Sequence, residues 1–305
     1  MGKHLKHYLF SVVISTYNRL SVLLENLTTL DLNEIKNNNA QIIIIENSST
    51  AKIFSQLKTF ETEFLKVFYL KDAGLSKARN YGASVSEGDF LIFLDDDAFP
   101  QKGWLDAFSN YIQNQNSDVD LLAGKIIPDY CGKPLPEWLP SDFEWIYGKL
   151  DYGEKTKHLG NSEIVNGGNF CIRRTIFKDL GGFDPLFGHV GECLGGSEEQ
   201  HLQDRYERKY HKPILYVPGA AVLHKFDRSR LSEEWAQKRV ASAVAHSFLR
   251  DRQNRSRFYI LTKSCSYVVR FPFVSSLKRV QCRTYLRTLR KNFISSFFSS
   301  KEVSV

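Results

Sequence analysis

Three consecutive aspartates, Asp95, Asp96 and Asp97, end an apolar run that reads FLIFLDDD. Carboxylates this close repel one another, and at the edge of a core they lose hydration that must be recovered elsewhere. A divalent cation accepts oxygen ligands and removes the repulsion. Because Mg²⁺ takes few protein carboxylates and completes its shell with water and phosphates, the stretch predicts a site for a metal–diphosphate complex. A solvated acidic turn is the alternative interpretation.

Polar segments also follow three other apolar runs. STYNR, ENSST and KDAGLSKARN come after the apolar runs at residues 10–15, 41–46 and 65–70, and the aspartates follow the run at 89–94. Sequences typical of helices separate these runs, at residues 21–30, 52–64 and 76–88. Apolar strands alternating with helices predict a parallel sheet covered on both faces, which binds ligands beyond the carboxyl ends of its strands. We therefore expect one site at this edge.

The pattern loosens after residue 120. Residues 121–128 predict another strand, whereas the proline- and aromatic-rich residues 128–145 predict an irregular loop or lid. Regular sequence returns at residues 166–184, followed by a predicted helix at 197–210 and a predicted closing pair of strands within 212–226. Two amphipathic, basic segments that predict helices then follow, at residues 235–253 and 280–293.

The charge is unevenly distributed along the 305 residues. Residues 1–225 contain 24 Lys and Arg against 29 Asp and Glu, whereas residues 226–305 contain 17 against 5. Residues 251–305 contain no stretch of the roughly 18 uncharged apolar residues that a membrane span requires. A basic amphipathic segment suits an anionic membrane surface, with a solvated appendage or a dimer contact as alternatives. We expect no nucleic-acid partner, because no recognisable module accompanies the charge.

Cysteine usage and the N-terminus indicate the compartment. The five cysteines are scattered and form no CxxC pair, which argues against a disulfide framework and for a reducing environment. The apolar run FSVVIS is too short for the hydrophobic region of a signal peptide. We therefore expect a cytoplasmic protein that associates peripherally with the inner face of the membrane.

Together these motifs resemble the GT-A fold of family 2 glycosyltransferases. The resemblance includes STYNR, ENSST, GLSKARNYGA, LDDD, NGGNFCIRR, GGFDP, SEEQHLQDR and LYVPGAAVLH, in the family's order over about residues 8–226. It implies an α/β, Rossmann-like, mostly parallel sheet flanked by helices in a domain of residues 1–226. The donor half would cover about residues 8–100 and the acceptor half about 120–226, with a basic helical extension at 227–305.

The resemblance also implies an activity. Family 2 enzymes transfer a sugar from a nucleotide diphosphate sugar to an acceptor, with inversion at the anomeric carbon. For this chain the resemblance implies a metal-dependent hexosyltransferase that uses Mn²⁺ or Mg²⁺. The acceptor would be a hydroxyl group of a glycan or a lipid-linked saccharide, in a pathway of polysaccharide biosynthesis.

On the donor side, the resemblance places Thr16, Tyr17 and Arg19 beside the nucleotide. It implies that Glu46 hydrogen-bonds the base, although most relatives have Asp there, and that Arg79 contacts the nucleotide or diphosphate. A surface charge on a helix is the alternative for Arg79. The adjacent glycines of the NGGN motif, Gly167 and Gly168, would let the backbone approach a sugar or phosphate, or would simply form a tight turn.

The metal site is implied by the DxD motif of the family. Asp95 and Asp97 match its two acidic positions, with Asp97 as the direct ligand, Asp95 towards the ribose or phosphate, and Asp96 in the variable middle position. His224 ends a predicted strand, where related enzymes place a histidine that completes the metal shell, and neutral imidazole is a competent ligand. A structural or merely solvated histidine is the alternative.

Inverting transfer requires a base near the acceptor hydroxyl. SEEQHLQDR resembles the family's Glu-Asp signature and places Glu199 at the usual Asp position, with Glu198 as the other candidate base. Both could instead be ordinary acidic residues at a helix start. Asp184 would lie near the acceptor or cap a helix. The aromatic residues of the loop would form a sugar-stacking wall or a satellite core: Trp138, Trp145 and Tyr147.

Two other function classes compete with this interpretation. A phosphohydrolase of the haloacid dehalogenase type also carries an Asp-x-Asp motif, but on its first strand, whereas here the motif ends the fourth. A non-catalytic sugar- or nucleotide-binding protein on a GT-A scaffold would lack the base or a metal ligand. Because all these residues are present in this chain, the enzyme is favoured over both alternatives.

Overall fold

A computed structural model describes residues 7–48, 51–114, 119–160, 163–188, 196–254 and 276–298. The strands are β1 (Phe10–Thr16), β2 (Ala40–Glu46), β3 (Leu65–Tyr69), β4 (Phe90–Asp95), β5 (Ala98–Pro100), β6 (Leu121–Asp129), β7 (Lys157–His158), β8 (Asn169–Arg173) and β9 (Leu215–Lys225). The α-helices are α1 (Leu20–Thr29), α2 (Leu32–Asn37), α3 (Lys52–Leu57), α4 (Leu75–Val85), α5 (Trp104–Asn114), α6 (Arg174–Asp179), α7 (Glu198–Tyr210), α8 (Glu233–Asn254) and α10 (Ser276–Phe298). Short 3₁₀ turns are η1 (Lys58–Phe60), η2 (Ser141–Tyr147), η3 (Pro185–Phe187) and η4 (Arg228–Arg230).

The nine strands form one sheet in the order β3-β2-β1-β4-β8-β6-β9-β5, and β7 pairs with β9. Strands β1, β2, β3, β4, β6 and β9 run in one direction, while β5, β7 and β8 run in the other. The first four strands are parallel and in register, and β2 is buried along its whole length. This confirms the predicted mostly parallel α/β sheet, whose apolar strands are covered on both faces.

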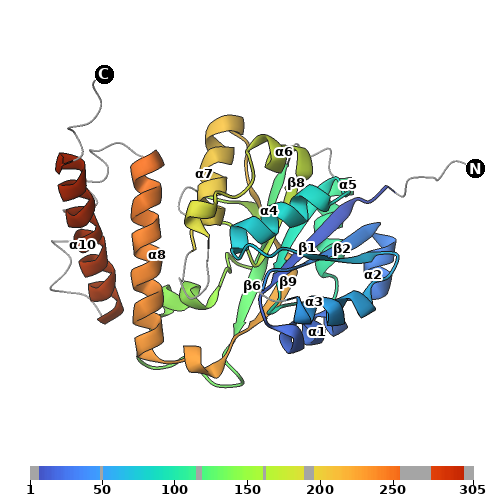
Figure 1. The fold of residues 1–305 in the computed structure, drawn as a ribbon, viewed down its shortest axis with the longest axis horizontal. Helices are drawn as coiled ribbons and strands as arrows, with labels where there is room; N and C mark the ends of the chain where they lie inside the picture. Colours follow the sequence, from blue (N-terminus) through green and yellow to red (C-terminus); the bar gives the residue numbers. More distant parts are fainter. Residues whose placement is uncertain are drawn as a thin grey trace, which may run out of the picture.

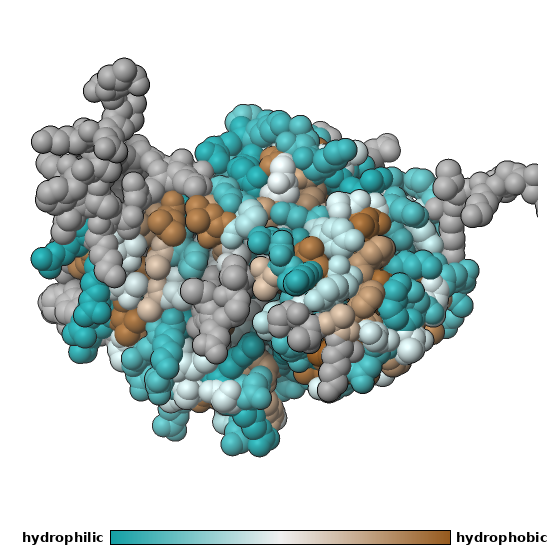
Figure 2. All heavy atoms as spheres, viewed as in Figure 1, coloured by the Kyte–Doolittle hydropathy of each residue, from teal (hydrophilic) through white to brown (hydrophobic). Residues whose placement is uncertain are grey.

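Helix α4 packs closely against the middle of the sheet because it contains a glycine. A Cβ atom on Gly82 would lie 2.4 Å from Cγ1 of Val13 on β1, so the helix can approach this strand only without a side chain here. The close packing fixes the start of α4 beside the carboxyl ends of β1 and β2. In Figure 2, hydrophilic side chains cover the outer surface of the molecule over α7 and α2.

The two C-terminal helices stand side by side at one end of the molecule (Figure 1). They form a second hydrophobic core with the turn η2, separate from the main core around the sheet. Tyr147 of η2 is stacked between Phe226 and Trp235, at ring-centroid distances of 4.8 and 5.4 Å. From α10, Leu277 and Tyr285 are fully buried in this core. The C-terminal helices therefore anchor the irregular segment that precedes residue 148.

Most predicted elements match the structure to within one or two residues, including the strands at 10–15, 41–46, 65–70, 89–94 and 121–128. The predicted closing pair of strands is wrong. The structure has the single strand β9, which continues through Pro218 and Gly219 because its pairing with β6 shifts register between Gly124 and Ile126. Both basic helices are confirmed as α8 and α10, whereas residues 255–275 lie outside the described part of the chain.

Candidate active site

A cleft of about 1140 Å³ opens at the carboxyl ends of β1 and β4. It is lined from one side by the ends of these strands and by α4, and from the other by α7, η2 and α8. The cleft brings together most of the predicted site residues, which include Thr16, Arg19, Arg79, Glu198, Glu199 and His224. The polar segments at the strand ends therefore belong to one site, as their positions in the sequence predicted.

A buried asparagine fixes the backbone of residues 95–98, which we call the aspartate turn. The Asn26 side-chain amide donates to the carbonyl oxygens of Asp95, Asp96 and Ala98, at distances of 3.3, 3.1 and 2.7 Å. This residue lies on the buried face of α1 beside Leu23. Sequence reasoning missed it, although a polar residue at an apolar position of an amphipathic helix is a visible signal. The contact fixes the backbone from which the three carboxylates project.

Two of the three aspartates share one arginine. Arg19 donates to Asp96 Oδ1 at 2.7 Å and to Asp97 Oδ2 at 2.9 Å, and Thr16 Oγ1 donates to Asp96 Oδ2 at 2.7 Å. Burial raises the pKa of Asp96 to about 7, and the adjacent Asp97 adds to the shift. Asp96 therefore has both oxygens engaged by protein groups. In this structure the predicted nucleotide neighbours Thr16 and Arg19 organise the carboxylates directly.

His224 faces the remaining oxygen of Asp97. Its Nδ1 lies 2.6 Å from the Tyr147 carbonyl oxygen and its Nε2 lies 3.4 Å from Asp97 Oδ1. Since a carbonyl oxygen only accepts, Nδ1 carries a proton, which leaves Nε2 directed at the carboxylate. Burial opposes the charged imidazolium, but Asp97 raises the pKa of His224 above its usual value. Burial likewise opposes ionisation of Asp97, yet His224 and Arg19 hold its pKa well below its usual range.

This donor set fits a divalent cation that is only partly held by protein. Asp97 Oδ1 and His224 Nε2 converge, and the backbone carbonyl fixes the imidazole tautomer, as is usual for metal-binding histidines. Asp95 lies on the same turn, but its Oδ1 accepts from Arg79 at 2.7 Å. Within the described residues, no group of three or more His, Cys, Asp or Glu side chains could hold a metal alone. Such a site suits a cation that completes its shell with water and phosphate oxygens.

Arg79 connects the aspartate turn to the acidic pair at the start of α7. Its Nη2 donates to Asp95, and its Nη1 lies 3.2 Å from Glu198 Oε1 and 3.0 Å from Glu199 Oε1. Only 2% of this residue is exposed, which excludes the alternative of a surface helix charge. Burial opposes its charge, but the carboxylates of Asp95, Glu199 and Glu198 outweigh burial and raise the pKa of Arg79.

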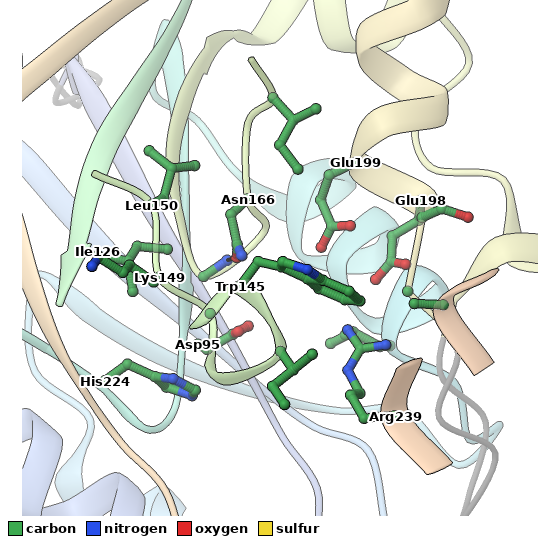
Figure 3. Close-up of a pocket in the computed structure, with 18 of the residues that line it drawn as sticks. Asp95, Ile126, Trp145, Lys149, Leu150, Asn166, Glu198, Glu199, His224 and Arg239 are labelled. Carbon is green, nitrogen blue, oxygen red and sulfur yellow. Dashed lines mark hydrogen bonds between the residues drawn. The ribbon is translucent and has the colours of Figure 1, made fainter. Parts of the chain in front are cut away.

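The two glutamates occupy different environments although they are adjacent in sequence. The Glu198 side chain is 1% exposed and that of Glu199 is 12% exposed. Burial raises the pKa of Glu198 to about 8, and the neighbouring Glu199 adds to the shift. Glu198 Oε2 has no hydrogen-bond partner among the described residues. In Figure 3 both side chains project from α7 towards the cleft.

The NGGN motif meets the same group of side chains. A Cβ atom on Gly167 would lie 2.0 Å from Glu199 Oε1 and 2.5 Å from Arg79 Nη1, and one on Gly168 would lie 3.0 Å from Asp95 Oδ2. In this structure Gly167 admits the glutamate and the arginine. The prediction that its backbone approaches a sugar or a phosphate stays a prediction, because protein groups already fill that side.

At the end of β2, Glu46 is fully buried and its Oε1 accepts from the Ser48 backbone amide at 3.0 Å. Its Oε2 has no partner among the described residues, so it retains an oxygen for a further donor. The next residue, Asn47, lines the cleft and accepts from the Gly74 amide at 2.8 Å, which ties β2 to the start of α4. Tyr17, at the other side of the strand ends, is 44% exposed and also lines the cleft.

The remaining predicted residues divide between site and scaffold. Trp145 lines the cleft, and in Figure 3 it lies between the side of Asp95 and His224 and the side of the two glutamates. Trp138 and Tyr147 pack in the second core, so the aromatic wall is reduced to one residue. Asp184 accepts from the Leu186 amide at 2.9 Å and caps η3, which is the alternative that the sequence left open.

Residues of the C-terminal helices form a wall of the cleft that sequence reasoning missed. From α8, Trp235, Arg239 and Arg250 line it, and from α10 Gln281 and Tyr285 do so. These residues lie in the segment that the sequence presented only as a basic extension. The signal that could have revealed them is the spacing of polar residues along one face of α8.

Comparisons with known proteins agree with this geometry. A family model described as glycosyl transferase family 2 matches residues 11–181. The chain is 27% identical over 167 residues to the glucosyl-dolichyl phosphate glucuronosyltransferase of Haloferax volcanii, covering 54% of this chain and 52% of that one. The chain thus spans about half the length of this curated relative.

Solved structures of low sequence identity share the fold. The mannosyltransferase PcManGT from Pyrobaculum calidifontis, in complex with GDP-Man and Mn²⁺, superposes with a TM-score of 0.56 at 13% identity over 98% of this chain and 77% of that one. GalNAc-T7 with UDP, GalNAc and Mn²⁺ superposes with a TM-score of 0.58 at 17% identity over 97% of this chain and 58% of that one. This likeness confirms the predicted GT-A fold. Because the family model covers more than half of the 305 residues, the chain belongs to glycosyl transferase family 2.

Proposed function

We propose that the chain is an inverting, metal-dependent glycosyltransferase, which moves a sugar from a nucleotide diphosphate sugar to a hydroxyl of a glycan or lipid-linked saccharide. The observation that carries the proposal is that one cleft holds both the converging Asp97 and His224 pair and the partly accessible carboxylate of Glu199. The first arrangement suits a metal-bound diphosphate and the second suits a base for the acceptor. Two of the three relatives above are a glucuronosyltransferase and a mannosyltransferase, and the third, GalNAc-T7, was solved with UDP and GalNAc. The two solved structures contain Mn²⁺.

The donor would lie across the carboxyl ends of β1, β2 and β4. Asp97 and His224 would hold Mn²⁺ or Mg²⁺, which when bound neutralises charge that develops on the leaving diphosphate. Tyr17 and Arg19 would border the nucleotide, with Thr16 and Asp96 beneath them, and the free oxygen of Glu46 would accept from the base. Arg79 keeps Asp95 beside the start of α7, so the donor and acceptor ends of the cleft keep a fixed spacing.

We assign the base to Glu199. A base must reach the acceptor hydroxyl, and the side chain of Glu199 is partly accessible whereas that of Glu198 is enclosed. The acceptor oxygen would give its proton to Glu199 as it attacks the anomeric carbon from the face opposite to the leaving nucleotide. Glu198, whose pKa is raised to about 8, would stay protonated near neutral pH and leave a single negative charge at Glu199.

Donor binding tests the first half of the proposal. The melting temperature of the full chain is measured in the presence of UDP-, GDP-, dTDP- and CMP-sugars, each with Mn²⁺, with Mg²⁺ and with EDTA. We expect one donor to raise the melting temperature with metal and to lose that effect with EDTA. The absence of a shift with every donor contradicts the proposal. Binding of a donor without any transfer or hydrolysis would instead support a non-catalytic binding protein.

We also propose a partner for α10, the anionic surface of a membrane. Four exposed arginines recur along one face of this helix, opposite to Leu277 and Tyr285: Arg279, Arg283, Arg287 and Arg290. Basic residues on the surface of an amphipathic helix attract anionic lipid at about 1 kcal/mol each. Among the described residues, no helix is long and apolar enough to cross a bilayer. The proposal places the protein at the inner face of the membrane, with the residue 227–305 extension as its contact.

Vesicle flotation tests this contact. Truncation is unsuitable because α10 is buried against α8, so the arginines are neutralised instead in the variant R279Q/R283Q/R287Q/R290Q. We expect the wild-type chain to float with phosphatidylglycerol vesicles and the variant to remain behind, while neither floats with phosphatidylcholine. Equal flotation of both proteins would contradict the assignment to α10.

A further inference from the structure

One face of α8 forms a wall of the cleft. Trp235, Arg239, Ala243, Ser247 and Arg250 all line it, at spacings of four, four, four and three residues. Residues with this spacing lie on the same side of an α-helix. The opposite side of the helix carries exposed residues such as Lys238, which is paired with Glu234 at 2.7 Å. The stripe that faces the cleft therefore contains two arginines, an alcohol and an aromatic ring.

Arg239 lies at the acceptor end of the cleft. Its Nη2 is 3.0 Å from the position that a Cβ atom of Gly196 would occupy, two residues before Glu198 at the start of α7. In Figure 3 it lies on the same side of Trp145 as the two glutamates and away from His224. Burial lowers the pKa of Arg239, and attraction to the two glutamates offsets only part of that effect. An anion bound beside Arg239 would offset more of it.

Arg250 continues the stripe away from the base. It lies three turns further along α8, about 16 Å from Arg239 at the rise of an α-helix, with Ser247 between them. Its Nε is 3.5 Å from Asp204 Oδ2, a loose contact on a side chain that is 21% exposed. A ligand that reaches both arginines is longer than a single sugar ring. The stripe therefore fits an extended chain.

Two further arginines that line the cleft have different roles, and a third, Arg230, lies over the ring of Trp235 at 5.8 Å from its centroid. Arg19 is bound by Asp96 and Asp97, and Arg79 by Asp95 and the glutamate pair. Both lie among carboxylates that hold the donor end of the cleft together. The arginines of α8 belong instead to the wall of the cleft at its acceptor end. A guanidinium group can bind an oxyanion there through two parallel hydrogen bonds.

We propose that this face of α8 is an acceptor subsite for an extended, anionic chain that carries phosphate or carboxylate groups near the hydroxyl to be glycosylated. The inference rests on the proposed function in one respect, because Glu199 as the base defines which end of the cleft receives the acceptor. Arg239 would bind the oxyanion nearest to that hydroxyl and Arg250 one further along the chain. Ser247 would contact the uncharged sugar or polyol between them, and Trp235 would contact the part of the acceptor beyond Arg239.

Calorimetric titration of the full chain tests the subsite. The anionic probes are glycerol 3-phosphate, farnesyl phosphate and glucuronate, and their uncharged counterparts are glycerol, farnesol and glucose. We expect at least one anionic probe to bind while its counterpart does not. In R239Q/R250Q we expect an affinity at least tenfold weaker, as for the loss of charge-assisted hydrogen bonds, and in R239K/R250K a smaller loss. The probe that binds identifies a soluble phosphate, a lipid phosphate or a carboxylate as the source.

Two controls separate this subsite from other cationic surfaces. K238Q/R208Q removes the same charge from outward faces of α8 and α7 and should bind the probes as the wild type does. D97N impairs the proposed metal site and should also retain probe binding, so that failure of the subsite and failure of the donor site are distinguishable. Equal probe affinity in wild type and R239Q/R250Q would overturn the proposal, as would loss of probe binding in D97N. Melting curves show whether each variant is folded. If R239Q/R250Q does not fold, the comparison of R239K/R250K with the wild type tests the subsite instead.

Discussion

The cleft contains two groups of carboxylates that are built differently. At the aspartate turn, Asp96 and Asp97 are bound by Arg19, Thr16 and His224, and the backbone is fixed by Asn26. At the start of α7, Glu198 and Glu199 share a single nitrogen of Arg79. The first group has charged and hydrogen-bonding partners for each carboxylate, whereas the two acids of the second group share one nitrogen of Arg79 and have Arg239 nearby. The comparison indicates that adjacent acids can be built into different environments, which in our proposal suit an anchor for a cation in one place and a proton acceptor in the other.

The largest expected effect concerns Glu199, the more accessible of the two glutamates. Glu199→Gln removes the carboxylate that would accept the proton, and general-base catalysis typically contributes about 10²- to 10⁴-fold. We expect kcat to fall by about a thousandfold, while the Kd for the donor changes by less than about twofold, since the donor would not contact this residue. Single-turnover transfer and calorimetry measure the two quantities. Normal turnover in Glu199→Gln would show that another residue is the base. Glu198→Gln is the matched control at the neighbouring position.

At the aspartate turn, Asp97→Asn should act on binding instead. The asparagine side chain keeps the shape of the aspartate but removes the negative charge that lies beside His224. The affinity for the metal and for the donor should therefore fall by about a hundredfold. Titration of the donor with and without Mn²⁺ measures this loss. If the variant and the wild type show the same metal-dependent affinity, the turn is not the metal site and the contrast between the two groups fails.

The pH dependence of stability should distinguish the buried acid. Because the folded chain raises the pKa of Glu198 to about 8, the folded state binds its proton more tightly than the unfolded state does. Its contribution to stability is therefore full below the unfolded pKa and is lost as the pH rises towards 8. Between pH 6 and pH 8 the wild type should lose about 2 kcal/mol that Glu198→Gln retains. Urea unfolding at both values tests this, and parallel slopes for the two proteins would contradict it.

A smaller effect should follow from the glycine beside Arg79. In Gly167→Ala the new methyl group would lie 2.0 Å from Glu199 Oε1, so the base and the arginine must move apart. We expect kcat to fall by about tenfold, because a displacement near 1 Å is enough to impair positioning. Gly132→Ala is the control, since a Cβ atom there meets no atom within 4 Å, although its positive φ of 72° costs some stability. Equal kcat in the Gly167 variant and the wild type would show that Glu199 is not held in place by Arg79.

Much of the donor half could be predicted from sequence. The period of apolar residues depends on local chemistry, so β1, β2, β3 and β4 were predicted correctly, and polar residues that follow β1, β2 and β4 line one cleft. The closing strand was predicted as a pair because Pro218 and Gly219 are typical of a turn, and only the pairing with β6 shows that the strand continues.

The wall of the cleft could not be predicted in the same way. The side chains of α8 reach the site only because α8 packs on η2 and α10 around Tyr147 and Phe226, a contact between segments far apart in the sequence. Likewise Arg79 could be placed on a helix, but its three carboxylate partners come from β4 and α7. Local pattern thus identifies candidate groups, whereas tertiary packing decides which of them meet.

The backbone carbonyl oxygen that accepts a hydrogen bond from His224 Nδ1 belongs to Tyr147, whose ring is stacked between those of Phe226 and Trp235. The orientation of the imidazole is therefore set by a residue whose own position depends on how the C-terminal helices pack. Looser packing of the second hydrophobic core should therefore lower the affinity of the proposed metal site for its cation. The packing of the second hydrophobic core thus bears on the donor end of the cleft through the carbonyl group of Tyr147.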